Sequence, residues 1–512
     1  MESGNGNEKK IEPDLEKDTI INNRYIILRK IGDGNFSKVY LVLDEEDKEK
    51  YAAKILLESR SQTDSKSFEY EIKILKKITE KPKLTKYVNQ YHDSGIGDAI
   101  KDNFISKERY YLISNYFSKK NLFTYLDKTQ EGFEEKHIKI IFSKILECFQ
   151  YIHSKDICHL DIKLENIMLD PHFIPIIIDF GLSYEMEKDD KNNYKLIDDK
   201  VIKGSPYYIS PQIWNYRKYS GIKADIFSLG VLLFFLATKH NSFTFARRSD
   251  PDYKLICLNQ PEKFEEFWEH FANLYPQLVN VSPEFKDLFL KMIAYREDRR
   301  PESISKIFEH PWMNDVKTFT ETDYLEYENM MNKLEDKVSQ DDETFQNIDK
   351  KIDPNSCTGN KSGNDSDKDK TYFDSNILPK YLFIQGLNAM NYIIIKGDLQ
   401  PYKFMNSLAN KLEREFDCKI YAYFKDLTFE ATFPNKLREE YESLEEIEEE
   451  EIEGDKPEQY IFKDCVIKIE FFEYINGGYE VHFTKREGEF MDYYSYFQQT
   501  KNIIKNILKI IN

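Results

Sequence analysis

Three oxygen-bearing side chains lie within 19 consecutive residues, 161–179, of this chain of 512 residues. Asp161 and Asn166 belong to the string HLDIKLEN, and Asp179 begins the string DFG. Two short apolar, β-branched runs flank an Asp170-Pro171 turn between the strings, so we expect a hairpin that brings the three side chains to one edge. Such a set can hold magnesium and orient a hydroxyl. The spacing therefore predicts the chemistry of phosphoryl transfer.

The two strings resemble the catalytic loop and the metal-binding motif of protein kinases. The resemblance implies that Asp161 takes up the proton of a substrate hydroxyl and that Lys163 neutralises the transferring phosphoryl group. Asn166 and Asp179 would hold the magnesium ion. A lysine two positions after the catalytic aspartate is typical of the serine/threonine-specific branch. One residue departs from the pattern, because Leu160 stands where most family members carry arginine.

A glycine-rich segment, IGDGNFSKVYLV, lies near the start of the kinase-like region. Glycines let the backbone approach a polyphosphate closely, and the valine could cover an adenine ring. The third glycine of the GxGxxG pattern is replaced by Ser37, so in isolation the segment fits a ligand-free hairpin better. The order of the motifs downstream favours nucleotide binding. The candidate ATP-binding residues in this segment are Ile31, Gly32, Asp33, Gly34 and Val39.

The string YAAKIL follows at the distance expected for the next strands of a kinase. The resemblance places Ala52 beside the adenine and directs Lys54 toward the α and β phosphates. This lysine needs an acidic partner, and the predicted helix FEYEIKILKKI offers Glu69 and Glu71. The resemblance favours Glu71.

The string RYYLISNYF, residues 109–117, is predicted to be a strand that runs into the connection between two lobes. By resemblance, Ser114 borders the adenine pocket, and backbone groups from Asn115 to Phe117 bind the adenine. Because Ser114 is small, we expect a deeper pocket than kinases with methionine or phenylalanine there would have. Met168 completes the candidate ATP-binding set.

The string GSPYYISPQIW, residues 204–214, resembles the segment of kinases that presents the substrate. Ser205 is expected to contact the catalytic loop. Gln212 replaces the usual glutamate, so a neutral hydrogen bond to Arg300 should replace a charge-assisted one. Asp225, on a predicted buried helix, is expected to brace the catalytic loop.

Leu160 has a regulatory implication. In family members with arginine at this place, the arginine binds a phosphorylated residue of the activation loop. That arginine is missing here, so we expect activity without loop phosphorylation. Aspartates of the loop could contact other basic groups instead; they are Asp189, Asp190, Asp198 and Asp199.

Substrate preference is only partly encoded. Glu165 matches an acidic residue that binds an arginine three positions before the target, whereas Asn121 replaces a second acidic residue. The expected partners are protein substrates with a modest basic preference. The net charge of -18 argues against a nucleic-acid partner.

Length and composition predict two or three domains and no secretory or membrane-spanning segment. The longest apolar stretch, residues 226–237, is too short to span a bilayer and reads as a buried helix. The six cysteines have no metal-site spacing, which fits a reducing compartment. We expect a cytoplasmic protein, with peripheral membrane or nuclear locations as alternatives.

The expected fold class is α+β. A bilobal protein kinase fold, with a small β-rich N-lobe and a large helical C-lobe, would be followed by a small α+β domain. The expected boundaries are a disordered tail at 1–24, the kinase domain at 25–313, an acidic flexible linker at 314–375 and the C-terminal domain at 376–512. An acidic insert occupies 439–458.

The C-terminal pattern is a strand, a helix, a hairpin around Asn476-Gly477-Gly478 and a terminal helix. This order resembles the kinase-associated-1 domain of AMP-activated-kinase-related kinases, which in relatives binds anionic lipids or docks on the kinase domain and inhibits it. A lysine stripe on the terminal helix could contact an acidic membrane, although a solvated helix face is the alternative. The stripe is Lys501, Lys505 and Lys509.

The primary interpretation is a serine/threonine protein kinase that uses ATP and magnesium. A pseudokinase scaffold is the first alternative, because Ser37, Leu160 and Gln212 depart from the family pattern. A lipid-binding adaptor is the second.

Overall fold

The computed structural model divides the chain into two units, residues 1–334 and 335–512, and helix α10 (Glu321–Asp349) runs across the boundary. The residues that the structure describes are 14–33, 37–57, 62–80, 87–101, 104–199, 202–215, 217–248, 250–275, 278, 281–349, 392–395, 401–416, 418–423, 428–433, 465–473 and 479–487.

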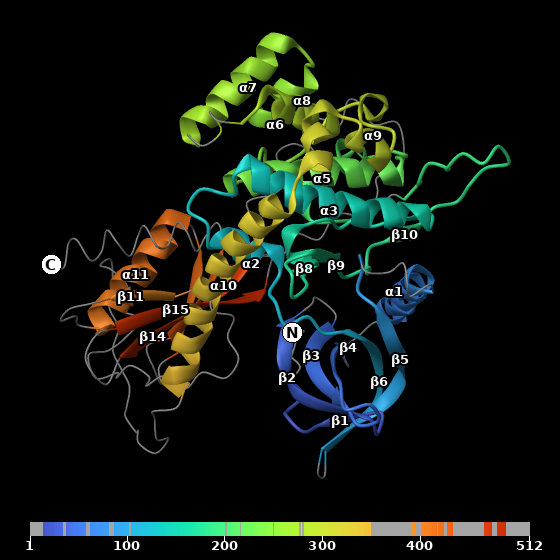
Figure 1. Cartoon of the computed structure of the whole chain (residues 1–512). Coiled ribbons are helices and arrows are strands. Elements are labelled where there is room, and N and C mark those ends of the chain that lie inside the picture. Colours follow the sequence, from blue (N-terminus) through green and yellow to red (C-terminus); the bar gives the residue numbers. More distant parts are fainter. Residues whose placement is uncertain are drawn as a thin grey trace, which may run out of the picture. The chain divides into compact units, whose positions relative to one another are not determined.

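The first unit begins with a small lobe built around a closed barrel (Figure 1). Its strands are β1 (Ile20–Ile21), β2 (Tyr25–Asp33), β3 (Ser37–Asp44), β4 (Lys50–Leu56), β5 (Tyr91–Lys101) and β6 (Phe104–Asn115), in the order β1-β2-β3-β4-β6-β5. Helix α1 (Gln62–Thr79) joins β4 to β5. Because side chains alternate along a strand, Tyr40, Val42, Ala53 and Ile55 fill the barrel core. The intervening residues point out of the barrel.

The barrel begins earlier than the sequence indicates. Ile20 pairs with Ile26 on one side and with Ile100 on the other, and Ile21 is completely buried in the barrel core. The prediction of a disordered tail over residues 1–24 is therefore wrong for residues 14–24. The β1 strand is needed to close the barrel between β2 and β5.

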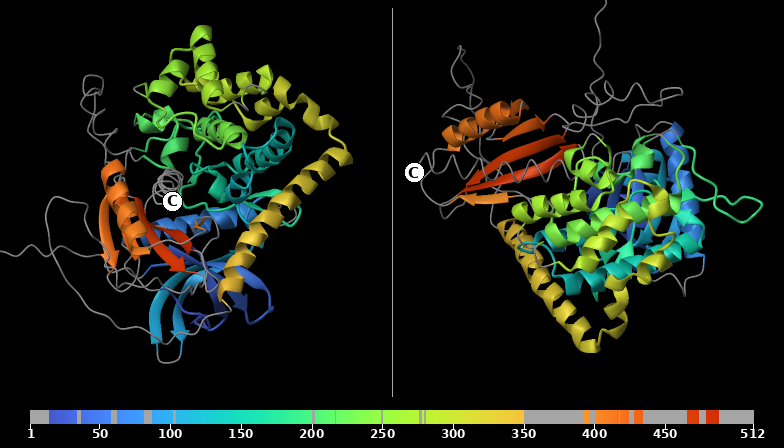
Figure 2. Two further views of the ribbon diagram at one scale, coloured as in Figure 1. Left: turned by 90° about the vertical axis from the view of Figure 1, so that its left-hand side faces the viewer. Right: turned by 90° about the horizontal axis from the view of Figure 1, so that it is seen from above.

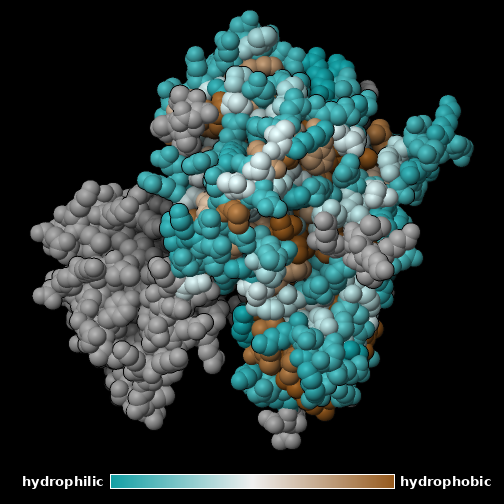
Figure 3. Space-filling model, in the orientation of Figure 1, coloured by the Kyte–Doolittle hydropathy of each residue, from teal (hydrophilic) through white to brown (hydrophobic). Residues whose placement is uncertain are grey.

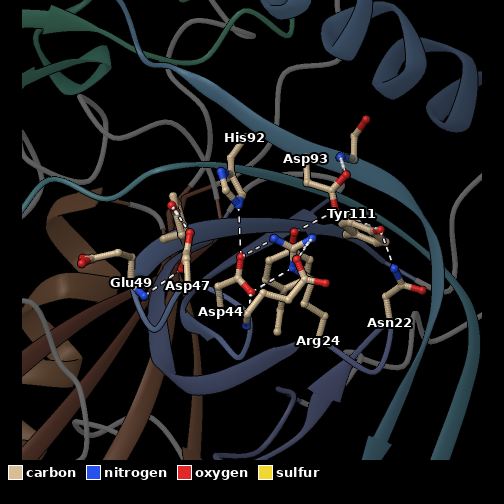
Figure 4. A network of polar contacts seen from close by, with 12 residues as sticks. Asn22, Arg24, Asp44, Asp47, Glu49, His92, Asp93 and Tyr111 are labelled. Carbon is tan, nitrogen blue, oxygen red and sulfur yellow. Dashed lines mark hydrogen bonds and ion pairs between the residues drawn. The ribbon is translucent and has the colours of Figure 1, made fainter.

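A polar network fastens the β1–β2 turn to β3 and β5 (Figure 4). Arg24 donates from Nε and Nη2 to the two carboxylate oxygens of Asp44 at 2.8 and 2.6 Å. The His92 ring nitrogen Nε2 lies 3.1 Å from the same buried carboxylate. The hydrogen bonds from Arg24 hold the pKa of Asp44 well below its usual range.

The second lobe of this unit is mainly helical (Figure 1). Its helices are α2 (Leu122–Asp127), α3 (Glu135–Ser154), α4 (Pro211–Trp214), α5 (Gly221–Thr238), α6 (Pro251–Cys257), α7 (Pro261–Leu274), α8 (Pro283–Met292) and α9 (Ile304–Phe308). Short 3-10 helices cover Leu164–Asn166, Pro206–Tyr208, Glu297–Arg299 and Pro311–Thr318. Short strands pair as β7 (Ile157–Cys158) with β10 (Tyr184–Glu185) and β8 (Ile167–Leu169) with β9 (Pro175–Ile177).

Helix α5 forms the centre of the large lobe. It begins after Ser220, whose hydroxyl accepts the N–H of Lys223, and it ends at Lys239 in a left-handed conformation. Among the described residues it is the one helix long and apolar enough to cross a membrane, but 89% of that stretch is buried inside the protein. The sequence prediction of a buried core helix is confirmed.

The face of the two lobes seen in Figure 3 is mostly hydrophilic, with apolar side chains gathered between the lobes and over the barrel.

The region after the large lobe is helical rather than a flexible linker over residues 314–349. The long helix α10 is visible in both views of Figure 2. Its Tyr327, Met331 and Leu334 are buried, and the Tyr327 hydroxyl donates to the carbonyl of Phe173 at 2.8 Å. These apolar residues recur at helical spacing inside an acidic sequence. A prediction based on composition therefore assigned the segment to a flexible linker.

Besides the end of α10, the described part of the second unit contains a five-stranded antiparallel sheet and the helix α11. The sheet order is β11 (Tyr392–Ile395), β15 (Tyr479–Glu487), β14 (Cys465–Glu473), β13 (Thr428–Phe433) and β12 (Lys419–Tyr423). Helix α11 (Pro401–Phe416) buries Met405, Leu408 and Leu412. The helix and the β14–β15 hairpin lie where the sequence pattern places them. The hairpin tip, the acidic insert at 439–458 and the terminal lysine stripe lie outside the described residues.

Candidate active site

The β8–β9 hairpin aligns the string HLDIKLEN with the string DFG. Ile167 pairs with Ile177, and the N–H of Ile178 donates to the carbonyl of Asn166 at 2.9 Å. Asn166 therefore precedes one strand at the same end at which Asp179 follows the other. The predicted hairpin is present, and it brings the catalytic loop and the DFG string together.

Four side chains of the catalytic loop and the substrate-presenting segment form one hydrogen-bonded group. Lys163 Nζ lies 3.0 Å from Asp161 Oδ2 and donates to Ser205 Oγ at 2.8 Å. Ser205 Oγ in turn donates to Asp161 Oδ1 at 2.7 Å. Asn166 Nδ2 donates to the carbonyl and to Oδ2 of Asp161 at 2.9 and 3.0 Å. Asp161 is thus oriented from three sides, with Ser205 at the place that the sequence predicts.

The backbone of this loop is held in an uncommon conformation. Leu160 and Asp179 have φ values of 61° and 59°, in the left-handed region that side-chain-bearing residues rarely adopt. The completely buried Asp225 accepts the N–H of His159 and of Leu160, both at 2.9 Å. Asp225 therefore braces the loop from α5, as the sequence predicts.

The lysine of β4 has two acidic partners. Lys54 Nζ donates to both carboxylate oxygens of Glu71 at 2.7 and 2.9 Å and to Asp179 Oδ1 at 3.0 Å. The predicted partner Glu71 is the one in contact, rather than its rival Glu69. Lys54 thereby joins the small-lobe helix α1 to the DFG string of the large lobe.

The pKa values in this group follow from burial and from the pairing. Burial opposes the charge of Lys54, but attraction from Asp179 and Glu71 outweighs it and raises the pKa of the lysine. Burial likewise disfavours a charged Asp179, yet attraction from Lys54 lowers the pKa of this carboxyl. The pKa of Glu71 is raised, mainly by burial. Because Asp179 keeps its charge, it is suited to binding a cation.

Two oxygen atoms remain for a metal ion. Asn166 uses its amide nitrogen on Asp161, so its side-chain carbonyl oxygen is available as a ligand. Asp179 uses Oδ1 for Lys54 and for the N–H of Gly181, and its side chain is 44% exposed. Hard oxygen donors of this kind suit magnesium. The donor set therefore fits the predicted ion.

The predicted nucleotide-binding residues of β3 and β4 share one face of the sheet. Gly32 pairs with Val39, Val39 with Lys54, and Ala52 with Ser114. Val39, Ala52 and Lys54 are half-buried, whereas the alternate residues fill the barrel core. Ile31 and Asp33 lie on β2, and Gly34 lies outside the described residues.

The lobe connection begins where β6 ends at Asn115. The buried Ser114 hydroxyl accepts a hydrogen bond from Asn89 Nδ2 at 2.9 Å. Asn115 is exposed and Phe117 is half-buried, and Met168 is a half-buried residue of β8 that bridges to Asn121. The polar contact of Ser114 was not predicted, because Asn89 lies on a different segment.

A second predicted pair lies away from the cleft. Arg300 Nη2 donates to Gln212 Oε1 at 2.6 Å, and Gln212 Nε2 donates to the carbonyl of Tyr295 at 2.6 Å. Arg300 also donates to the carbonyls of Ala294 and Lys223 at 2.7 and 3.1 Å. Burial lowers the pKa of Arg300 to about 10. The predicted pairing of Gln212 with Arg300 is confirmed, although the donor is a charged guanidinium and only the acceptor is neutral.

The protein kinase domain family matches residues 25–313, which is more than half of the chain. The chain belongs to the protein kinase family. This kinase is 26% identical over 317 residues to death-associated protein kinase 2 of Mus musculus, covering 60% of this chain and 76% of the relative. It is 26% identical over 294 residues to serine/threonine-protein kinase SAPK2 of Oryza sativa subsp. indica, covering 56% and 76%.

A third relative extends the same group. Calcium-dependent protein kinase 4 of Plasmodium falciparum is 28% identical over 328 residues, covering 62% of this chain and 55% of the relative. Together with the family match, these relatives make the enzyme a protein serine/threonine kinase, and the two-lobed fold of its first unit is the fold of that family.

Sequence reasoning also missed a contact of this kinase between α1 and β10. Glu185 of β10 accepts hydrogen bonds from Lys73 and Lys77 of α1 at 2.7 and 2.8 Å. The partners are separated by 112 and 108 positions, and no local motif marks either side. A charged residue in a loop gives no signal of its partner until the fold is known.

Proposed function

We propose that this kinase transfers the γ-phosphoryl group of ATP to serine or threonine hydroxyls of protein substrates. The observation that supports this most directly is the connected group of Lys54, Glu71 and Asp179. Lys54 would neutralise the nucleotide phosphates, and magnesium, when bound by Asn166 and Asp179, would offset the charge that develops on the phosphoryl group. Asp161 would accept the proton of the substrate hydroxyl.

We further propose that phosphorylation of the activation segment is not required. The sequence between Ser183 and Ser205 contains no serine or threonine, so a kinase of this specificity finds no target there. Ser183 itself is buried, and Ser205 is engaged with Asp161. Leu160 removes the arginine that would bind a phosphate.

The described part of the segment is already ordered by its own contacts. Asp156 Oδ1 accepts the Tyr194 hydroxyl at 2.6 Å and pairs with Lys188 at 2.7 Å. Asp189 caps a turn by accepting the N–H of Lys191 and of Asn193. These contacts support an active arrangement without added phosphate.

A phosphoryl-transfer assay with radiolabelled ATP tests both proposals. Phosphatase-treated wild-type chain should phosphorylate peptides that carry serine or threonine, but not the same peptides with tyrosine. The variants Lys54→Met and Asp179→Asn should lose nearly all signal. Equal signal from all three proteins would exclude the enzymatic reading and favour a scaffold. A treated chain that is inactive until its loop is phosphorylated would contradict the second proposal alone.

Glu165 supports a modest preference for an arginine three positions before the target. Asn121 contributes no charge, because it is an amide, and its side-chain oxygen caps α2 by accepting the N–H of Thr124. Two peptides that differ in that single arginine should differ by less than about tenfold in kcat/KM, in line with one charge pair near the surface. The variant Glu165→Gln should remove the difference.

We propose that the second unit regulates or localises the kinase, in a cytoplasmic or peripheral membrane setting. Support comes from the sequence pattern of residues 376–512 and from the lysine stripe at Lys501, Lys505 and Lys509. A truncation after residue 349 keeps α10, which packs on the large lobe through Tyr327. Higher activity of the truncated chain would indicate autoinhibition.

A second experiment measures binding of the full chain to anionic liposomes. If binding is unchanged when the three lysines of the stripe are replaced by glutamate, the stripe does not contact the lipid.

A further inference from the structure

Glu185 joins the activation segment to α1, the helix that carries Glu71. Its carboxylate accepts hydrogen bonds from Lys73 and Lys77, and its backbone N–H donates to the hydroxyl of Tyr70 at 3.0 Å. All three partners lie on α1, on either side of Glu71 in the sequence. One residue therefore holds this helix at three points.

The other side of Glu185 is tied to the catalytic loop. Glu185 pairs with Ile157, and Tyr184 with Cys158, in the β7–β10 ladder. The next residue, Met186, donates its N–H to the carbonyl of Asp156 at 2.7 Å. Strand β7 leads directly into His159 and the catalytic loop. The position of α1 is thus connected to the catalytic loop through a single short strand.

We propose that Glu185 is a positioning residue that holds α1, and with it the Lys54–Glu71 pair, in the active arrangement in place of a loop phosphate. This inference rests on the proposed kinase function and deepens it. A phosphate bound between the loop and basic side chains supplies negative charge that orders a segment. Here a carboxylate supplies that charge to two lysines of α1, and it is present without modification.

The expected size of the effect follows from exposure. The side chains of Lys73, Lys77 and Glu185 are 62%, 34% and 31% exposed, so each pair is partly screened by water. The hydrogen bonds from the two lysines lower the pKa of Glu185, so the carboxylate is charged at neutral pH. Two such pairs acting on one equilibrium should change kcat/KM by about three- to tenfold rather than abolish it.

The test compares the full-length chain with the isosteric variant Glu185→Gln. We expect kcat/KM for ATP to fall about three- to tenfold, with the KM for the peptide substrate unchanged. Hydrogen exchange in α1, residues 62–79, should become faster. The double variant Lys73→Glu with Lys77→Glu should behave similarly, and adding Glu185→Lys should restore both activity and slow exchange.

The matched control is Glu187→Gln. Glu187 is two positions further along the segment and pairs with Lys195 at 3.0 Å, within the activation segment. It should leave activity and exchange at wild-type values. Restoration by the charge-swapped triple variant is a result that general destabilisation would not give.

Two outcomes overturn the inference. Wild-type activity and exchange in Glu185→Gln would show that the contact is dispensable, and failure of the charge swap to restore either readout would show that pairing is not the cause. The exchange measurement separates this inference from the proposed function, because it reports the α1 contact even in a chain that transfers no phosphate.

Discussion

This kinase holds two interior cations in opposite ways. Lys54 in the catalytic cleft contacts two carboxylates, which raise its pKa. Arg300 in the large lobe is 2% exposed and contacts backbone carbonyls and the neutral Gln212, and its pKa is lowered to about 10. The charge of Lys54 therefore serves the reaction, whereas the charge of Arg300 serves the hydrogen bonds that it makes inside the large lobe.

The comparison also predicts how each site responds to change. The group of Lys54, Glu71 and Asp179 contains two carboxylates and one ammonium group. Its net charge is therefore negative, and a metal ion or a cationic side chain can offset it. The arginine group has its donors engaged by four acceptors, which are the side-chain oxygen of Gln212 and the carbonyls of Ala294, Lys223 and Tyr295. Substitution at Lys54 should therefore act on catalysis, and substitution at Arg300 should act on folding.

The largest expected effect is that of Lys54→Met on activity. Removing the ammonium group takes away a charge that acts on the reacting phosphates, so kcat should fall by at least about 10² to 10³. The assay is steady-state phosphorylation of a serine peptide. Lys50→Met on the exposed end of the same strand is the control and should remain active.

The same variant has a pH-dependent effect on stability. Lys54 lowers the pKa of Asp179, so it contributes stability that is present above the unfolded pKa near 3.8 and is lost as the pH falls further. The difference in Tm between the wild type and Lys54→Met should stay nearly constant from neutral pH down to about pH 4 and should shrink as the pH falls below that value. A difference that grows on acidification would contradict this assignment of charges.

Arg300→Met should mainly reduce stability. Gln212 Oε1 and the carbonyls of Ala294 and Lys223 would lose their donor, which we expect to cost about 2 to 4 kcal/mol in the free energy of unfolding. Denaturant unfolding measures the loss. Arg299→Met, at the exposed neighbouring position, should cost far less. A catalytic defect as deep as that of Lys54→Met, in folded protein, would end the distinction between the two sites.

Gln212→Glu gives Arg300 a carboxylate partner, as Lys54 has in the catalytic cleft. A carboxylate would pair with Arg300, but it would also place an oxygen where Gln212 now donates to the carbonyl of Tyr295 at 2.6 Å. We therefore expect a net gain of only about 1 kcal/mol. Gln212→Ala should instead lose about 1 to 2 kcal/mol. A gain in the free energy of unfolding well above the value expected for Gln212→Glu would mean that neutral partners stabilise the buried charge of Arg300 incompletely in the native protein.

The smallest effect should come from an exposed ion pair near Arg300. Lys306 and Glu309 lie 2.7 Å apart, with 53% and 62% of their side chains exposed. Lys306→Gln should change the free energy of unfolding by less than about 0.5 kcal/mol. Salt should screen this contribution but leave the Arg300 site unaffected, because buried groups are screened much less.

The sequence was sufficient where function constrains residues close together in the chain. Asp161, Asn166 and Asp179 are brought together by a short hairpin, whose turn and β-branched strands are local signals. The pairings of Lys54 with Glu71, 17 positions apart, and of Gln212 with Arg300, 88 positions apart, have no such local signal, and they were predictable through the family resemblance.

The sequence was insufficient where the deciding partner is remote and unmarked. Ile20 lies in a polar stretch of sequence, so its place in the barrel is evident only from its pairing with β2 and β5. The apolar face of α10 is interrupted by acidic residues, so composition outweighed periodicity. Glu185 carries no local sign that it will meet Lys73 and Lys77.

The way Asp225 holds the catalytic loop explains why the side chain at position 160 is free to differ. Asp225 binds the main-chain amides of His159 and Leu160, and every residue type except proline offers the same amide. This anchor of the catalytic loop therefore does not require arginine at position 160, where the side chain of Leu160 is buried. The anchor is carried by main-chain atoms, so a leucine side chain can stand at position 160 without removing it.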